Sequence, residues 1–439
     1  MKQKQISILV GMLCSSAMPA VWAAATAEAK LDDVVVIADR TEQSIDKTAA
    51  NVSVINRKGL DKAGASNIKD AIRYEPGVNA VADPVRYGNA GFNIRGIEGN
   101  RILMMIDGVR LPESYAAGRG NGAIAGRDLV EFDTLRQVDI VKGPYSSLYG
   151  SDALGGVVNY ASYKPEDFVD EEKPWYLGLK QSYDSANKGH ATTVSAAGQK
   201  GIASGLIMYT KRKSDEYKNR GHLDIEGAGR TKPNPLDFTS DNVLAKGVLA
   251  EGAHRLEGTV EYHKRTTEVT DLTALTRSGP IPRTGMRTNL QNSNDEAKRQ
   301  RFGLTYTYQP MDSWLDELVV GASRQKLDSQ DTLIQKFLNT KTQVNSTEYS
   351  DYDFNQTIDA LHGQMRARIQ AGQITHAITA GVDYTETKTD RGRQKTRSIE
   401  GGPLSLVDGS KTFPDSERKN LGVYIQDAIT FENGVRLTP

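Results

Sequence analysis

From Trp175 onward, apolar and polar residues alternate with a period of two. In residues 256–263, one face carries Leu256, Gly258, Val260 and Tyr262, and the other carries Glu257, Thr259, Glu261 and His263. Residues 301–309 and 361–370 repeat the pattern. A strand with one apolar and one polar face is typical of a membrane barrel with a wet interior, and a soluble β-sandwich has the same period. The period therefore predicts strands and leaves two kinds of sheet open.

The links between the strands favour the barrel. The pattern predicts about ten strands, near 175–184, 191–199, 203–213, 243–250, 256–267, 299–309, 317–330, 345–370, 374–388 and 419–430. Links after even-numbered strands are short, such as 200–202 and 371–373. Several links after odd-numbered strands are long: 214–241, 271–298 and 391–418. Short turns on one side and long loops on the other are typical of outer-membrane barrels, so we expect an antiparallel transmembrane β-barrel over residues 166–439.

Residues 92–160 have a different pattern, in which short apolar runs are separated by glycines. Such runs predict short buried strands, joined by tight turns in which glycine supplies a positive φ. The runs are 102–106, 138–141 and 157–158. Residues 68–78 contain Pro76-Gly77 near their end, which predicts a short helix that stops there. The residues alone therefore indicate a small α+β domain.

Two motifs in this domain resemble the plug domain of TonB-dependent outer-membrane receptors. The first reads FNIRGIEGNRILMMIDGVRLPE over residues 92–113, and the second reads VDIVKGPYSSLYGSDALGGVVNY over residues 138–160. The alternative interpretation is a glycine-rich soluble α/β domain whose sequence resembles these motifs by coincidence. The resemblance implies a plug over residues 46–165, followed by a barrel that has about 22 strands in this family. Because about ten strands are expected here, it also implies an N-terminal fragment of a longer receptor.

Residues 1–25 have the features of a secretory signal peptide. Lys2 and Lys4 form a basic start, residues 6–18 form a short apolar core, and Ala23 belongs to a small-residue cleavage site. We therefore expect export, and the family resemblance implies the outer membrane of a Gram-negative cell. The only cysteine, Cys14, lies in this leader, so no disulfide or thiolate chemistry is expected in the mature chain.

Composition and motifs exclude several classes of function. The chain has 55 basic and 55 acidic residues, and this balance argues against a nucleic-acid partner, which favours a basic surface. The sequence has no His-Glu-x-x-His motif, no Walker A lysine and no Gly-x-Ser-x-Gly motif. We therefore expect no enzyme activity and no intrinsic cofactor, and we expect outer-membrane lipid around the barrel.

Residues 26–45 are expected to form a TonB box and a periplasmic linker. Here a short apolar segment follows an acidic pair, and such an extended segment can add as a strand to the sheet edge of another protein. The segment resembles the TonB box, which implies binding of TonB and its inner-membrane energising complex. The residues involved are Asp33, Val34, Val35, Val36, Ile37 and Ala38. The alternative is that they form the first strand of the plug itself.

Two short segments are most like the haem and haemoglobin receptor branch of the family: Leu111-Pro112-Glu113 and Gly126-Arg127-Asp128. This likeness implies that the cargo is haem, free or from a haemoprotein. A ferric siderophore or cobalamin is the alternative cargo. Some members of the branch use a plug histidine as an axial iron ligand, but residues 56–188 of this chain contain no histidine.

Candidate cargo-binding residues lie in the polar, glycine-rich segment 114–136 and on an outside loop. Apical plug loops face the cargo in this family, which implies roles for Tyr115, Arg119 and Asn121. Tyr115 can replace the missing histidine, because phenolate is a known haem-ligand type. His222 is the histidine candidate on the expected outside loop. An ordinary solvated side chain is the alternative at each position, and no metal ligand is assigned.

Together these features predict energised import. Cargo binds above the plug, TonB pulls on residues 33–38, and the plug shifts to open a path. An exported β-rich surface binding protein without transport is the alternative from a different class. An exported hydrolase has no residues in its favour.

Overall fold

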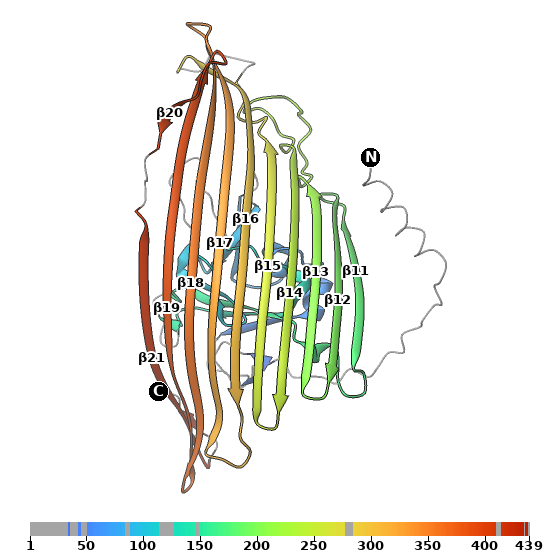
Figure 1. Ribbon diagram of the computed structural model, residues 1–439, viewed down its shortest axis with the longest axis vertical. Helices are drawn as coiled ribbons and strands as arrows, with labels where there is room; N and C mark the ends of the chain where they lie inside the picture. Colours follow the sequence, from blue (N-terminus) through green and yellow to red (C-terminus); the bar gives the residue numbers. More distant parts are fainter. Residues whose placement is uncertain are drawn as a thin grey trace, which may run out of the picture.

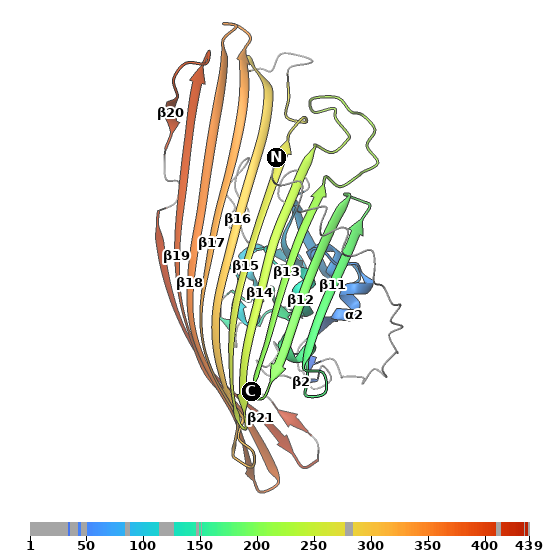
Figure 2. The ribbon, with the colours of Figure 1, turned by 45° about the vertical axis from the view of Figure 1, so that its right-hand side comes forward.

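The structure is a computed structural model that describes residues 34–35, 43–44, 51–83, 88–113, 127–145, 149–150, 152–276, 284–409, 414–433 and 435–437. It contains a plug, residues 51–167, and a barrel wall, residues 175–437. The plug lies against one face of the wall (Figure 1). The turned view shows that the wall is curved (Figure 2).

A five-stranded sheet forms the centre of the plug. Its order is β3-β9-β10-β7-β8, in which β10 pairs with β7 in parallel and the other pairs are antiparallel. The strands are β3 (Val52–Asn56), β7 (Ile102–Ile106), β8 (Val109–Arg110), β9 (Leu135–Lys142) and β10 (Gly156–Ser162). The three apolar runs lie in β7, β9 and β10, and every residue of β7 and β10 is buried, which confirms the prediction of short buried strands.

Smaller elements complete the plug. They are β4 (Val78–Asp83), β5 (Gly88–Ile94) and β6 (Ile97–Glu98) in a second sheet, the helices α2 (Arg57–Lys62) and α3 (Ile68–Ala71), and the 3-10 turns η2 (Gly99–Arg101), η3 (Phe132–Thr134) and η4 (Pro165–Asp167). Each helix begins at an asparagine that accepts a backbone hydrogen bond: Asn56 from Gly59 (2.9 Å) and Asn67 from Asp70 (3.0 Å). The short helix expected within residues 68–78 is α3. Over the described residues, no helix has the length and apolar content needed to cross a membrane.

The plug has a continuous apolar core under its main sheet. Tyr160 lies at its centre, with its ring centroid 6.3 Å from that of Phe92 and 6.0 Å from that of Phe132. Leu60 of α2 and Ile68 of α3 are buried in the same core. Burying a large apolar side chain stabilises the fold by roughly 1.5–3 kcal/mol, so packing holds these helices, which are too short to persist alone.

Gly156, the first residue of β10, is a position in this core where only glycine fits. Its φ is 153°. An added Cβ would lie 2.4 Å from the carbonyl oxygen of Val141 and 2.8 Å from Cδ1 of Ile94. This close backbone approach lets β10 pair with β7 and β9 at the same time.

The barrel wall is a 12-stranded sheet. Its long strands follow one another in chain order and are antiparallel: β11 (Trp175–Asp184), β12 (Gly189–Lys200), β13 (Ala203–Asp215), β14 (Leu236–Glu251), β15 (His254–Thr270), β16 (Met286–Tyr308), β17 (Leu315–Asn339), β18 (Asn345–Ala371), β19 (Ile374–Ile399) and β21 (Ser416–Phe431). Two short strands, β20 (Ser405–Asp408) and β22 (Arg436–Leu437), pair with β19 and β21. Among the described strands β11 pairs only with β12, so the wall curves without closing.

The two faces of the wall differ as the alternation predicts. In β15, Leu256 and Val260 are exposed on the outer face, whereas Glu261 and His263 are buried on the inner face. Large apolar side chains continue the outer band across the other strands, including Phe302, Val320, Leu361, Val382 and Val423. Such a band is the surface that meets lipid in an outer-membrane barrel.

The structure extends several strands well beyond the predicted ends. β16 begins at Met286 rather than near residue 299, and β17 and β19 continue to Asn339 and Ile399. The expected loops 271–298 and 391–418 are therefore wrong over many of their residues, and the loop expected at 214–241 shrinks to 216–235. Outside the lipid band both faces of a strand have polar surroundings. The alternation of apolar and polar residues is therefore lost, although the backbone ladder continues.

Replacing Gly156 by alanine should destabilise the plug selectively. The added methyl group overlaps the Val141 carbonyl and forces a residue other than glycine to adopt φ 153°, which together should cost about 2–4 kcal/mol. Limited proteolysis of the protein in detergent, read from cuts within residues 51–167, measures this loss. Gly91→Ala is the control in the same domain, because its added Cβ meets no atom within 4 Å. Equal protease resistance of the two variants would contradict the role given to Gly156.

Candidate functional site between the plug and the barrel wall

The apical segment of the plug, residues 114–126, lies outside the described residues, together with three candidate cargo-binding residues: Tyr115, Arg119 and Asn121. The structure shows where this segment starts. The backbone N–H of Glu113 donates to Oε1 of Gln356 on β18 (2.8 Å), and the Glu113 carboxylate pairs with Arg418 on β21. The segment therefore leaves the plug beside the wall.

Arg127 follows directly after the apical segment and is buried in the plug. Its guanidinium donates to Oδ1 of Asn100 (2.7 Å), to the sulfur of Met104 (3.3 Å) and to the carbonyl oxygen of Ile102. Burial lowers the pKa of Arg127 to about 10 against the opposing effect of Glu113, so the side chain stays charged at neutral pH. Both ends of the apical segment are thus fixed by polar contacts.

A small cavity of about 30 Å³ lies between the plug and the wall near these two ends. Ion pairs compensate charges in its lining: Arg110 pairs with Asp152 (2.6 Å), and Arg418 pairs with Glu113. A cavity of this size holds a water molecule and not a cargo molecule. The cargo-binding site therefore does not correspond to this cavity.

His222 lies on the loop 216–235, which connects β13 to β14. Its side chain is exposed, and its backbone N–H donates to Oγ1 of Thr231 (3.1 Å). A hydrogen bond from Asn67 to Oη of Tyr217 (3.3 Å) ties this loop to the plug near α3. The apical segment starts beside β18 and β21 instead. The loop that carries His222 therefore contacts the plug at a different place from Glu113, the last described residue before the apical segment.

The expected TonB box is described over two residues, Val34 and Val35. They form β1, which pairs antiparallel with β2 (Gln43–Ser44) in a sheet of its own and not with the main sheet of the plug. The segment is therefore extended there, as strand addition would require. Four other residues of the expected box lie outside the described residues: Asp33, Val36, Ile37 and Ala38.

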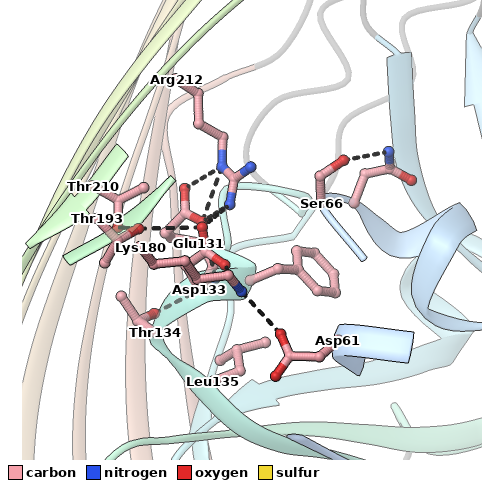
Figure 3. A network of polar contacts seen from close by, with 12 residues as sticks. Asp61, Ser66, Glu131, Asp133, Thr134, Leu135, Lys180, Thr193, Thr210 and Arg212 are labelled. Carbon is pink, nitrogen blue, oxygen red and sulfur yellow. Dashed lines mark hydrogen bonds and ion pairs between the residues drawn. The ribbon is translucent and has the colours of Figure 1, made fainter. Parts of the chain in front are cut away.

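A network of ion pairs joins the turn η3 of the plug to the inner face of β11–β13 (Figure 3). Arg212 of β13 forms two contacts through its Nη2: with Glu131 (2.5 Å) and with Asp133 (2.7 Å). Its Nε also donates to both carboxylate oxygens of Glu131 (3.0 and 2.9 Å). Such two-pronged contacts fix the orientation of the guanidinium as well as its position.

Lys180 of β11 extends the network by bridging Asp133 (2.8 Å) and Asp61 of α2 (2.9 Å). Burial alone would raise the pKa of Asp133, but Arg212 and Lys180 hold it below its ordinary value. Asp133 is therefore charged at neutral pH. Thr193 of β12 donates to the same carboxylate (3.2 Å). One small turn of the plug thus contacts three neighbouring strands of the wall.

A second network lies on the inner face of β15 and β16. Arg299 and Arg301 of β16 share Glu261 of β15, at 2.5 Å and 3.0 Å, and Arg301 also pairs with Asp107 of the plug (2.9 Å). Arg299 donates to the carbonyl oxygen of Leu129 in the plug (3.0 Å). Both guanidiniums are almost fully buried, so their partners are needed to offset the loss of water.

Asp107 is held by its own turn and by the wall together. Its carboxylate accepts hydrogen bonds from the backbone N–H (2.8 Å) and the hydroxyl (2.7 Å) of Ser162. Lys246 of β14 lies 3.2 Å from the same carboxylate. Although burial would raise the pKa of Asp107, Lys246 and Arg301 keep it well below its ordinary value. The Asp-Gly turn of the first motif is therefore also a contact with the wall.

An apolar contact accompanies the ion pairs. Leu129 of the plug is fully buried against Ala297, Leu327 and Phe354, which lie on β16, β17 and β18. It follows directly after Asp128, whose carboxylate pairs with Arg265 of β15 (2.7 Å). The segment after the apical loop is therefore anchored to the wall by one ion pair and one inserted side chain.

The sequence alone does not predict these plug–wall contacts. The available signal was weak, because Arg212, Arg299 and Arg301 occupy polar-face positions that any solvated side chain could fill. Asp107 belongs to the first plug motif, but the motif alone gives no partner for it on the wall. The strand registers align the wall residues with one another, and the docking of the plug then brings its carboxylates beside them.

Comparison with known proteins finds relatives in sequence and in fold. The chain is 30% identical over 283 residues to the hemoglobin-haptoglobin-binding protein A of Haemophilus influenzae, covering 62% of this chain and 27% of the relative. It is 28% identical over 407 residues to the hemoglobin-binding protein A of Haemophilus influenzae, covering 88% of this chain and 38% of the relative. The chain thus spans well under half the length of these curated relatives.

The solved structure of BauA, the ferric preacinetobactin receptor from Acinetobacter baumannii, matches with a TM-score of 0.59 at 14% identity, covering 92% of this chain and 59% of that chain. This similarity supports the fold alone. Two family models also match: the TonB-dependent receptor plug domain over residues 44–157, and the TonB dependent receptor-like β-barrel over residues 211–439. The plug seated against a β-barrel wall and the two family matches lead to the same conclusion: this chain belongs to the TonB-dependent receptor family.

Proposed function

We propose that the full-length receptor imports haem, free or taken from a haemoprotein, across the outer membrane. The observation that carries the proposal is the similarity to haemoglobin-binding proteins, which in one case extends over 88% of this chain. Haem is the cargo in this proposal and not an intrinsic cofactor. We expect outer-membrane lipid to surround the barrel, because the outer face of the wall carries a band of exposed apolar side chains.

The proposed energised step is a TonB-driven shift of the plug. TonB takes residues Asp33–Ala38 as an added strand, which means exchanging the two residue pairs that join β1 to β2. Beyond this segment the chain enters the plug at β3, an edge strand of the main sheet. A pull therefore acts first on a strand with one neighbour, which is easier to detach than a central strand.

The proposed cargo-binding residues belong to the apical segment 114–126 and to the loop 216–235. Tyr115 and His222 are the candidate iron ligands, because phenolate and imidazole both bind haem iron. Arg119 and Asn121 supply a cation and an amide for the propionates. The described residues on either side of the apical segment support this proposal, because polar contacts hold both Glu113 and Arg127.

A ferric siderophore is the second candidate cargo. The observation that favours it is the lack of any histidine in residues 56–188, which removes the usual imidazole ligand from the plug. A siderophore wraps its own iron and needs no protein ligand to the metal. The fold accommodates either cargo, so binding measurements have to separate them.

Replacing Val35 by proline should abolish import while leaving cargo binding unchanged. Proline removes the backbone N–H that an added strand would use, so TonB loses its hold while the outer surface is untouched. Haem uptake by cells and haem bound at the cell surface are the two measurements. Val35→Thr is the control, because threonine is also a good strand former and keeps the N–H. Unchanged uptake in the proline variant would contradict import driven through residues 33–38, whereas surface binding with no uptake even in the wild type would favour a passive surface binding protein.

Haem titration of the full-length receptor, refolded in detergent, should give a saturable Soret shift. The shift should change its position in Tyr115→Phe or in His222→Ala if that residue is the iron ligand, because the axial ligand sets the electronic state of the haem. Tyr217→Phe, on the same outside loop as His222, is the control. A folded receptor with no Soret shift at all would move the proposal from haem to a siderophore.

Arg212 should be required to keep the plug seated. Arg212→Met leaves Glu131 and Asp133 buried without their main cation, which should cost about 3–5 kcal/mol. We expect greater protease sensitivity of the plug and entry of large antibiotics that the closed receptor excludes. Adding Glu131→Gln and Asp133→Asn should restore much of the loss, since the buried charges are then removed.

The matched control for this prediction is Arg324→Met. Arg324 forms an equally short ion pair with Asp359 (2.6 Å), but it lies exposed on the outer face of β17. An exposed pair is screened by water and contributes little to stability, so the plug should stay seated. If Arg212→Met and Arg324→Met behave alike, the network around Asp133 does not hold the plug.

A further inference from the structure

Nine ion pairs between described residues of the plug and the wall have the same polarity. In each of the following pairs of described residues, the plug supplies the carboxylate and the wall supplies the cation. The pairs are Lys180 with Asp61 and Asp133, Arg212 with Glu131 and Asp133, Lys246 and Arg301 with Asp107, Arg255 with Glu166, Arg265 with Asp128, and Arg418 with Glu113. The wall therefore carries cations that the seated plug neutralises.

Five inward-facing cations of β14, β15 and β16 lie one after another along the wall. Arg265 and Arg255 are residues of β15 itself. Strand register places the other three at levels between them: Arg299 opposite His263, Arg301 opposite Glu261, and Lys246 opposite Thr259. We call these five residues the cation ladder. At about 3.3 Å per residue it extends over about 33 Å, similar to the roughly 30 Å hydrocarbon thickness of a bilayer.

Every rung of the cation ladder is in contact with the plug in this structure. Arg265 pairs with Asp128 (2.7 Å), and Arg299 donates to the carbonyl oxygen of Leu129 (3.0 Å). Arg301 and Lys246 share Asp107 (2.9 and 3.2 Å), and Arg255 pairs with Glu166 (2.6 Å). The plug thus presents carbonyl and carboxylate oxygens along the whole ladder.

Four wall carboxylates are described beside the five cations of the ladder. Glu261 contacts Arg299 and Arg301, and Glu257 contacts Arg255 (3.0 Å) and Lys246 (3.5 Å). Asp295 and Asp331 lie on the inner face just beyond Arg265, where they offset that rung. When the plug carboxylates leave, the positive surplus therefore lies on the four rungs from Arg299 to Arg255.

We propose that an anionic, carboxylate-bearing iron chelate moves along the cation ladder, on the inner face of the wall, once the plug has shifted. The proposal rests on the proposed function of energised import and adds the charge class of the cargo and its path. Cations on the wall of a narrow, low-dielectric passage focus the field and raise the local concentration of anions. The cargo carboxylates then occupy the positions that the plug carboxylates have left.

The spacing of the rungs suits stepwise movement. Neighbouring levels from Arg265 to Lys246 are two residues, or about 7 Å, apart along β15. A cargo with two carboxylates, such as the propionates of haem, can keep one contact while the other reaches the next rung. No single cation then binds the cargo too tightly, because a wall carboxylate, or a plug group when the plug moves back, competes for the same cation.

The test uses the full-length receptor in cells with an intact TonB system. Arg255→Glu combined with Glu166→Arg keeps an ion pair between plug and wall but reverses the charge that remains on the wall. Lys246→Gln neutralises one rung and leaves Asp107 with Arg301. We expect the initial rate of haem uptake to fall by about tenfold in the charge-swapped variant and by less in Lys246→Gln. Haem bound at the surface of cells without TonB should be unchanged in both.

Arg324→Asp combined with Asp359→Arg is the matched control, because it swaps an ion pair on the outer face of the wall. Its uptake rate should equal that of the wild type. Wild-type uptake in both ladder variants, or an equal fall in the control, would overturn the ladder. A wild-type receptor that neither binds nor imports haem would instead contradict haem as the cargo.

A second measurement tests the ladder without any cargo. The full-length receptor in a planar bilayer is opened with a urea concentration that unfolds the plug while the barrel remains. The reversal potential in a KCl gradient then reports the preference for anions over cations. The charge-swapped variant should shift this potential toward cations, and Lys246→Gln should shift it less. Equal reversal potentials for the wild type and both variants would overturn the proposal, whichever cargo the receptor carries.

Discussion

Each strand of the wall faces lipid on one side and the plug on the other, and the rest of the structure depends on this constraint. The backbone groups are satisfied within the sheet, so the two environments are matched by side chains alone. In β15, Val260 belongs to the apolar outer band, and Glu261, the next residue, is buried on the inner face. Because the inner face is polar, the plug is held by ion pairs as well as by apolar contacts such as that of Leu129.

An ion-paired interface suits a plug that has to move. A buried apolar contact is lost entirely when its surfaces separate, whereas a carboxylate and a guanidinium that separate can both regain water. Arg212 with Glu131 and Asp133 therefore seats the plug firmly without making release prohibitively costly. Removing only one partner is different, because it leaves a buried charge uncompensated. The same contacts thus explain both the stability of the closed state and the possibility of opening it.

The sequence predicts much of the fold because many strands are marked by short apolar runs or by alternation of apolar and polar residues. The buried strand β7 and the alternation in β15 each follow from a few neighbouring residues. The outer halves of β16 and β19 could not be predicted, because their surroundings are polar on both faces and no alternation marks them. The pairing of Arg301 with Asp107 could not be predicted either, since it joins residues 194 positions apart. Such a contact depends on register and on how the plug docks, and neither has a local signal.

The cargo is decided by a different part of the molecule from the part that identifies the family. The plug sheet and the wall strands are constrained by packing and lipid, so receptors for different cargoes can share them. Loops that meet only water tolerate change and are where recognition residues gather. In this chain our proposal assigns recognition to Tyr115, Arg119 and Asn121 and to the loop 216–235 that carries His222. The proposed cation ladder would select only for negative charge, a property that haem shares with siderophores that carry carboxylates. Specificity for one cargo therefore has to come from the outer loops, and the wall beneath them sets a broader requirement for charge.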